Sequence, residues 1–345
     1  MARAAKKATK AVLSDAAKAL MEEASAFNYQ RKAAMAWARG IDHAGDVEVK
    51  PTEGFDLNRT IFTTLEGKLP RAVIGAKISK SVFWSDKAAA KIEDAYQQTR
   101  SDAEIPEVNP ALLDFMVEEC DFSMEHADGT FLEHLVFCHD YSALHFPDYS
   151  PTVMLLHSIM GTGTNTFAME ASKIERLRAL LDEFEYSHIE AFPSVLRLLA
   201  NLDLLDELNA NLHRLNDLKS IEFFRVIDNA PLSMSVEDFW VQLNYQLVHY
   251  VDFLPVANWG AYNADPLIQQ LDLLSTFLDR AGKRMATVRF EKPTWTNRVV
   301  GETQTTVSKL SMFLPSLVTR KMAAKAIKQF SAQIGHDLSY RLVWN

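Results

Sequence analysis

Apolar residues recur three and four positions apart over most of the chain after residue 110, a spacing typical of helices with one buried face. The stretches with this pattern are 110–120, 131–145, 173–186, 193–202, 235–253, 265–278, 303–314 and 315–334. Pro193 is predicted in the first turn of its helix, and Ser235 as the residue that caps the next one. The pattern predicts a mainly α, irregular multi-helix globular domain.

The pattern changes between residues 46 and 84. Val47, Val49 and Ile61 favour strands, and Pro51 and Gly54 interrupt them, so we predict a small β or extended segment there. The predicted organisation is an N-terminal basic helical arm (1–45), a mixed extended and helical segment (46–109), and a main α-helical domain with basic C-terminal helices (110–345).

Composition places the chain among folded soluble proteins, with 48% hydrophobic and 23% charged residues. No apolar run reaches the roughly 18–20 residues of a membrane span. Only Cys120 and Cys138 are present, and no secretory signal opens the chain, which predicts a reducing, intracellular location. The alanine-rich, basic opening fits both a solvated helix and a mitochondrial transit peptide, so mitochondrial and cytoplasmic locations both stay open.

Charge is unevenly distributed. Residues 1–39 hold eight basic and three acidic residues, and residues 280–345 hold twelve and three. The total net charge is −9, which leaves −23 for residues 40–279. Basic ends on an acidic body suggest contact with something acidic: the body itself, neighbouring protein subunits or an anionic membrane surface. The acidic body and the lack of a reader motif argue against nucleic acid.

The C-terminal helices carry the candidate binding residues for such a partner. Basic and apolar side chains alternate between residues 308 and 330. The basic ones proposed to bind a partner or a membrane are Lys309, Arg320, Lys321, Lys325 and Lys328. A basic amphipathic helix can lie on an anionic surface, but the same side chains can also cover the solvent face of a packed helix. Both interpretations stay open.

Histidines are crowded between residues 124 and 157. Five of the ten lie there: His126, His134, His139, His145 and His157. Imidazole is the commonest metal ligand in proteins. Within one helix, His134 and His145 are three turns, roughly 16 Å, apart. A metal would therefore need ligands from another element, with Glu118, Glu119, Glu125, His126 and His157 as candidates.

The stretch LVFCHDYSAL contains adjacent His139 and Asp140 and resembles the HD dipeptide of metal-dependent phosphohydrolases and related oxygenases. In that superfamily the adjacent pair, at the end of an apolar helix, binds one or two metal ions. The resemblance covers about ten residues, and a second such dipeptide, His336-Asp337, lies near the C-terminus. It implies a hydrolase or oxygenase that uses a divalent metal, either iron, manganese or zinc.

Two functions follow from these observations. The favoured one is a non-catalytic helical subunit or scaffold of a larger intracellular, organellar or membrane-associated assembly, without a cofactor, because no complete catalytic signature is present. The alternative is a metal-dependent hydrolase or oxygenase with a His/Asp cluster within 126–157, whose metal ligands are His134, His139, Asp140 and His145. Under the alternative, these four side chains should converge around a pocket.

Overall fold

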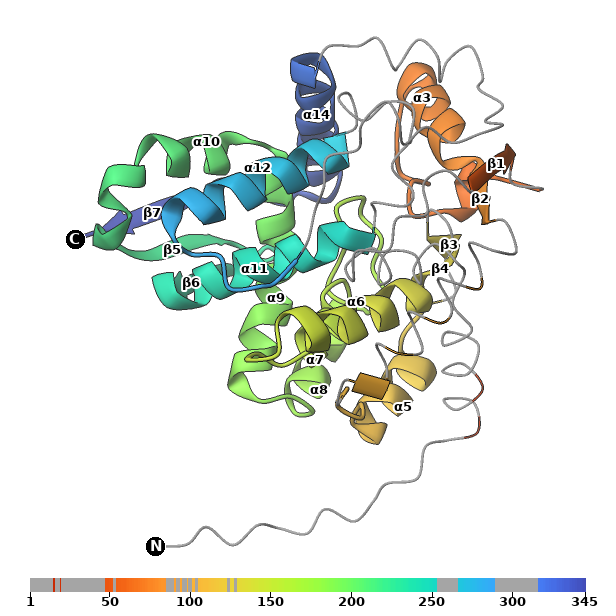
Figure 1. Ribbon diagram of the computed structural model, residues 1–345, viewed down its shortest axis with the longest axis horizontal. Helices are drawn as coiled ribbons and strands as arrows, with labels where there is room; N and C mark the ends of the chain where they lie inside the picture. Colours follow the sequence, from red (N-terminus) through yellow and green to blue (C-terminus); the bar gives the residue numbers. More distant parts are fainter. Residues whose placement is uncertain are drawn as a thin grey trace, which may run out of the picture.

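A computed structural model confirms the mainly helical fold (Figure 1). It describes residues 47–51, 54–84, 101–102, 105–122, 125–126, 129–252, 266–288 and 316–345, with a few isolated residues before 100. None of the helices within these ranges is long and apolar enough to cross a membrane. The predicted helices at 1–45 and 303–314 lie largely outside the described residues.

The extended segment predicted near residues 46–84 is present as two strands. Strands β1 (Val47–Pro51) and β2 (Lys80–Trp84) pair antiparallel, with Val49 opposite Val82. Between them lie η2 (Leu57–Arg59) and helix α3 (Lys68–Ile78). The loop before α3 contacts the main domain, because the Thr64 hydroxyl donates to the carbonyl of Thr164.

The main domain is composed mainly of helices. Its elements are α5 (Pro110–Glu119), β3 (Glu125–His126), β4 (Gly129–Thr130), α6 (Phe131–His145), α7 (Thr152–Leu156), η3 (Ala171–Lys173), α8 (Ile174–Arg178), α9 (Glu183–Ala200), α10 (Asp203–Ala210), η4 (Leu212–Asp217), β5 (Leu218–Phe224), β6 (Pro231–Ser235), α11 (Val236–Asp252), α12 (Pro266–Ala281), α14 (Ser316–Ile334) and β7 (Arg341–Trp344).

Helix α11 is the centre of the core. It packs against α6, α9, α12 and the strand β5, and every residue from Phe239 to Asp252 is buried. The predicted cap is confirmed: the Ser235 hydroxyl accepts from the backbone N–H of Asp238 and donates to its carboxylate. A helix that is buried on all sides forces its polar residues into the core as well, which matters for the site below.

The boundary predicted at Pro193 is wrong. Helix α9 begins ten residues earlier, where Asp182 accepts from the N–H of Glu185 and Glu185 reaches back to the N–H of Asp182. This capping box starts the helix, and Pro193 lies in its interior. Proline has no N–H, so the helix lacks the bond that residue 193 would otherwise donate to the Ile189 carbonyl, a cost that the packing of α9 against α7 and α11 offsets.

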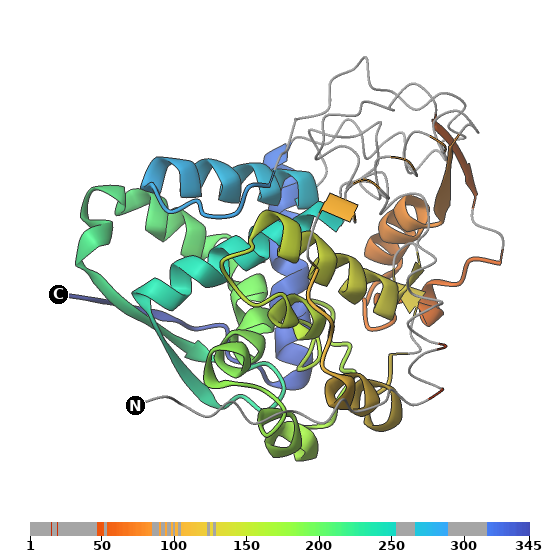
Figure 2. The ribbon, with the colours of Figure 1, turned by 60° about the horizontal axis from the view of Figure 1, so that its bottom comes forward.

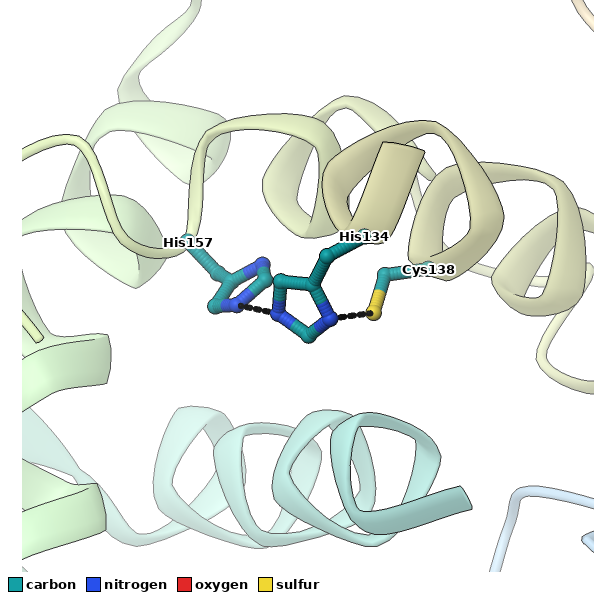
Figure 3. A group of neighbouring side chains, drawn as sticks. All are labelled: His134, Cys138 and His157. Atoms are coloured by element: carbon teal, nitrogen blue, oxygen red, sulfur yellow. Dashed lines mark hydrogen bonds between the residues drawn. The ribbon is translucent and has the colours of Figure 1, made fainter. Parts of the chain in front are cut away.

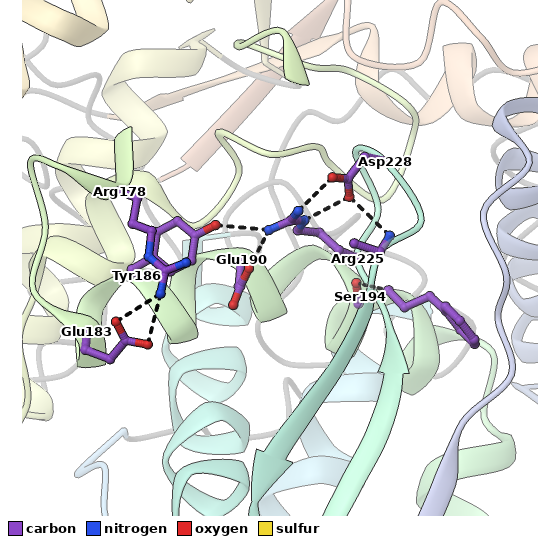
Figure 4. Close-up of polar contacts among 9 residues, drawn as sticks. Arg178, Glu183, Tyr186, Glu190, Ser194, Arg225 and Asp228 are labelled. Atoms are coloured by element: carbon purple, nitrogen blue, oxygen red, sulfur yellow. Dashed lines mark hydrogen bonds and ion pairs between the residues drawn. The ribbon is translucent and has the colours of Figure 1, made fainter. Parts of the chain in front are cut away.

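A three-stranded antiparallel sheet, in the order β6-β5-β7, was not predicted. The loop between β5 and β6 is anchored to α9 by Arg225 (Figure 4). Its guanidinium donates to both carboxylate oxygens of Asp228 (2.8 and 2.7 Å), to Glu190 (2.6 Å) and to the Tyr186 hydroxyl (3.0 Å). We call these four residues the arginine network. Asn229 closes the loop in the left-handed conformation (φ 58°).

Helix α14 stands against α9 and α12 (Figures 1 and 2). The fully buried Arg197 of α9 ties it in place, donating to the Thr162 carbonyl, the Asn165 side chain and the Ser331 hydroxyl. Burial lowers the pKa of Arg197 to about 10, so the side chain stays charged at neutral pH.

Candidate functional site

Three histidine rings meet in the middle of the core. His134 comes from α6, His157 directly follows α7, and His249 comes from α11. Their ring centroids are 4.7–5.2 Å apart. Cys138, one turn after His134, and Asp252, one turn after His249, complete what we call the histidine centre. All five side chains are buried.

The hydrogen bonds of His157 fix its protonation. Its Nδ1 lies 2.6 Å from the Met154 carbonyl oxygen, which can only accept, so Nδ1 carries the hydrogen. Burial lowers the pKa of His157 to about 4, although the bond to Met154 and the charge of Asp252 act in the opposite direction. The ring is therefore neutral at pH 7, and its Nε2 presents a lone pair.

His134 is oriented in the same way. Its Nδ1 lies 2.6 Å from Oδ2 of Asp252, the geometry of a ring N–H that donates to a carboxylate. Its Nε2 points at Nε2 of His157, 3.1 Å away (Figure 3). In a neutral His134 both facing nitrogens would carry lone pairs, which repel each other. The arrangement is stable when a cation, either a proton or a metal ion, lies between the two nitrogens.

The distances fit a metal ion. Two imidazole nitrogens bound tetrahedrally to Zn²⁺ at 2.0–2.1 Å are about 3.3 Å apart, close to the 3.1 Å observed. Cys138 Sγ lies next to the other nitrogen of the same ring, 3.8 Å from His134 Nδ1 and on the side away from His157 (Figure 3), and one ligand atom each from His134, Cys138 and His157 lie within 4.8 Å of one another. Asp252 then takes the place of the carboxylate that commonly orients a metal-bound histidine.

The structure brings only His134, of the four predicted metal ligands, into this centre. His139 lies elsewhere on α6 with its Nδ1 3.0 Å from Asp140 Oδ1, and both side chains are buried. His145 ends the helix, where its ring packs at a tilt against that of Tyr141 and its Nδ1 contacts the Thr287 hydroxyl at 3.2 Å. In the second dipeptide, His336-Asp337, the Nε2 atom of His336 donates to the backbone carbonyl of Phe224, so this histidine holds the backbone in place.

The basic residues predicted to bind a partner divide into two groups. Arg320 and Lys328 face the acidic helix α10, 4.0 Å from Asp206 and 3.8 Å from Asp203 respectively. Lys321 and Lys325 are exposed. Lys309 lies outside the described residues. For the first pair, the body of the protein itself is an acidic partner.

Two members of the centre, His249 and Asp252, were missed as site residues. They are three positions apart on a helix whose other residues are mainly apolar, so they share a face that must be buried. A histidine and an aspartate on the same face of a buried helix are the signal that could have found them. His157 had been named only as one of several possible additional ligands.

Comparison with known proteins adds no relative: no family model, curated protein or solved structure matches the chain.

Proposed function

We propose that the protein binds one divalent transition-metal ion, most favourably Zn²⁺, within the histidine centre. The single observation that carries the proposal is the pair of Nε2 atoms of His134 and His157, which face each other at 3.1 Å while both Nδ1 atoms are engaged as donors. Two imidazoles and a thiol form a donor set that suits zinc better than the oxygen-seeking Mg²⁺ or Ca²⁺.

Each residue of the centre has a defined role in this proposal. His134 and His157 supply the two nitrogen ligands, and Cys138, which contacts the Nδ1 side of the His134 ring, is the candidate for a third ligand as a thiolate. Asp252 holds the proton on Nδ1 of His134, and the Met154 carbonyl holds the proton on Nδ1 of His157, so the two Nε2 atoms that face each other are the nitrogens proposed to bind the metal. The ion joins α6 to the segment after α7.

The burial of the ligands favours a structural ion over a catalytic one. His134, Cys138 and His157 are at most 1% exposed, and structural zinc sites are closed in this way. Zinc binding would then add to folding stability, because the unfolded chain does not hold the three ligands together. This is compatible with a non-catalytic helical protein.

Elemental analysis of protein purified without added metal or chelator tests the proposal. We expect near-stoichiometric zinc, iron or manganese in the wild type, its loss in His157→Ala, and its retention in His139→Ala. His139 is the matched control because it is buried on α6 outside the centre. If neither the purified wild type nor the wild type incubated with zinc retains metal, the cation between the rings is a proton and the proposal fails.

One further observation favours a second candidate function, a subunit that docks on an acidic neighbour. Helix α14 exposes Leu317 (56%), Val318 (40%) and Met322 (38%) beside Lys321 and Lys325, and all five share one face. Apolar side chains flanked by lysines suit an acidic surface, such as the body of a neighbouring copy with its net charge of −23 over residues 40–279.

Sedimentation of the wild type and of Lys321→Glu/Lys325→Glu tests this second function. We expect concentration-dependent association of the wild type that weakens with salt and is absent from the double variant. A wild type that is monomeric at all concentrations would contradict docking between copies. Binding to vesicles rich in phosphatidylserine, again lost in the double variant, would show that the acidic surface is a membrane.

A further inference from the structure

A row of polar side chains runs along one buried face of α11. Asp238, Gln242, Gln246, His249 and Asp252 follow at intervals of four, four, three and three residues, which places them on a common side of the helix. We call these five residues the polar row. Gln242 and Gln246 are fully buried, and the row leads from the start of α11 to the histidine centre.

The outer end of the polar row is in contact with solvent. The Asp238 side chain is 45% exposed, and its Oδ1 lies 3.8 Å from Nε2 of the fully buried His188 on α9. Nδ1 of His188 is in turn 2.8 Å from Oε1 of Gln242. Burial lowers the pKa of His188, so the ring is held neutral beside the row.

Within the row and beside it lie polar atoms for which the described residues supply no partner. Nε2 of Gln242, Oε1 of Gln246 and Nε2 of His188 are buried and have no hydrogen-bond partner within the described residues. The other end of the Gln246 amide is fixed, because its Nε2 donates to the Phe192 carbonyl (3.0 Å). Buried polar groups in folded proteins are nearly always satisfied, and internal water is the usual partner when the protein supplies none.

The spacing of the row suits such water molecules. Residues four apart on a helix are about 6 Å apart along its axis, close to the length of two hydrogen bonds in series. One water molecule can therefore accept from Gln242 Nε2 and donate to Gln246 Oε1. If the Gln242 amide is turned over, the same water donates to both glutamines, so the bridge does not depend on amide orientation.

The inner end of the row joins the centre. The His249 ring lies 4.7 Å from the ring of His157 and 5.2 Å from that of His134, measured between centroids. We propose that buried water molecules occupy the polar row between Gln242 and Gln246 and connect the histidine centre to solvent at Asp238, so that protons of the centre exchange with bulk water along this row. The inference does not rest on metal binding, since water would follow the same side chains in either case.

Hydrogen exchange at the centre tests the inference directly. In metal-free protein labelled with ¹⁵N in its histidine rings, the rate at which the Nδ1–H of His157 exchanges with water is measured by magnetisation transfer. We expect measurable exchange in the wild type and at least a tenfold slowing in both Gln246→Leu and Gln242→Leu, which remove the polar atoms that hold the water.

Gln270→Leu is the matched control, because Gln270 is a buried glutamine on α12 whose Nε2 also lacks a partner but which lies outside the row. We expect wild-type exchange in that variant. A loosened fold would accelerate exchange, so slowing cannot result from partial unfolding. Unchanged exchange in both row variants, or slowing in all three, would overturn the proposal. A wild-type Nδ1–H that does not exchange at all would overturn it as well.

Discussion

The histidine centre and the arginine network are both polar groups in a largely apolar protein, but they are satisfied in different ways. In the arginine network the Arg225 guanidinium faces the carboxylates of Asp228 and Glu190 and the Tyr186 hydroxyl, so each of its three nitrogens meets an acceptor (Figure 4). In the histidine centre two nitrogen acceptors, those of His134 and His157, face each other.

The difference separates a structural polar cluster from a candidate binding site. The arginine network is complete with its own residues, and its role is to hold the β5–β6 loop on α9. The histidine centre is complete only with a cation between its rings. The orientation of the two Nε2 atoms, which face each other, therefore indicates a binding site better than the number of polar residues or the depth of their burial does.

Of the substitutions considered, replacing Arg225, which removes the positive charge of the arginine network, should reduce stability most. Arg225→Met leaves Glu190 and Asp228 without their counter-charge, and burial already raises the pKa of Glu190. We expect a loss of about 3 kcal/mol in the free energy of unfolding, measured in urea, with metal content unchanged. Arg341→Met is the control, since Arg341 and its partner Glu222 are both well exposed and lie outside the arginine network. An equal loss in the two variants would contradict the account.

Within the histidine centre, Asp252→Asn should weaken metal binding without abolishing it. The amide is similar in shape but holds the proton on Nδ1 of His134 less strongly, so we expect zinc affinity to fall by about 10–100-fold. Competition with a chromophoric chelator measures this change. Asp140→Asn alters another buried carboxylate of the same core and should leave the affinity unchanged. Equal affinities for wild type and Asp252→Asn would show that Asp252 does not orient a ligand.

Acid should destabilise the metal-free protein in part through His188, which lies outside the arginine network. Burial lowers its pKa in the folded state, so the unfolded state takes up a proton first as the pH falls below about 6.5. The stability present above that pH is then lost, by at most about 1.4 kcal/mol per pH unit. Urea midpoints at pH 7 and 5.5 should differ more for the wild type than for His188→Gln. His213→Gln, at an exposed histidine, should behave as the wild type does. Identical pH dependence in all three proteins would contradict this role of His188.

The smallest effect is expected where charges pair at the surface. The Lys328 side chain is 59% exposed and lies 3.8 Å from Asp203, so Lys328→Ala should cost about 0.5 kcal/mol or less. In high salt, which screens surface charges, the variant and the wild type should unfold at the same urea midpoint. A loss comparable to that of Arg225→Met would mean that the basic helix α14 is held to the body mainly by charge.

Much of the fold could be predicted from the sequence because helix periodicity is a local signal. Helix α6 was predicted at 131–145, as observed, and Ser235 was correctly identified as the cap of α11. The third strand of the sheet β6-β5-β7 was missed because β7 pairs with β5 across more than a hundred residues, and such a partner leaves no local pattern. Pro193 misled the α9 prediction because tertiary packing outweighed a local preference.

The candidate site was only partly predictable. Crowding of histidines pointed to the correct region and included His134 and His157, but adjacency in sequence gave too much weight to His139 and Asp140. Side chains that meet in a core come from different helices, and α11 contributes His249 and Asp252 from more than ninety residues further along the chain. The mutual orientation of ring nitrogens, on which the proposal depends, exists only in three dimensions.

Anomalous diffraction above and below the zinc absorption edge, on crystals of zinc-loaded protein, tests the central claim most directly. We expect one strong peak between the Nε2 atoms of His134 and His157, within bonding distance of both, and no such peak in His157→Ala. In fully zinc-treated wild type, rings that stay within direct hydrogen-bond distance with no anomalous peak between them would show that a proton alone occupies the centre and would contradict the account.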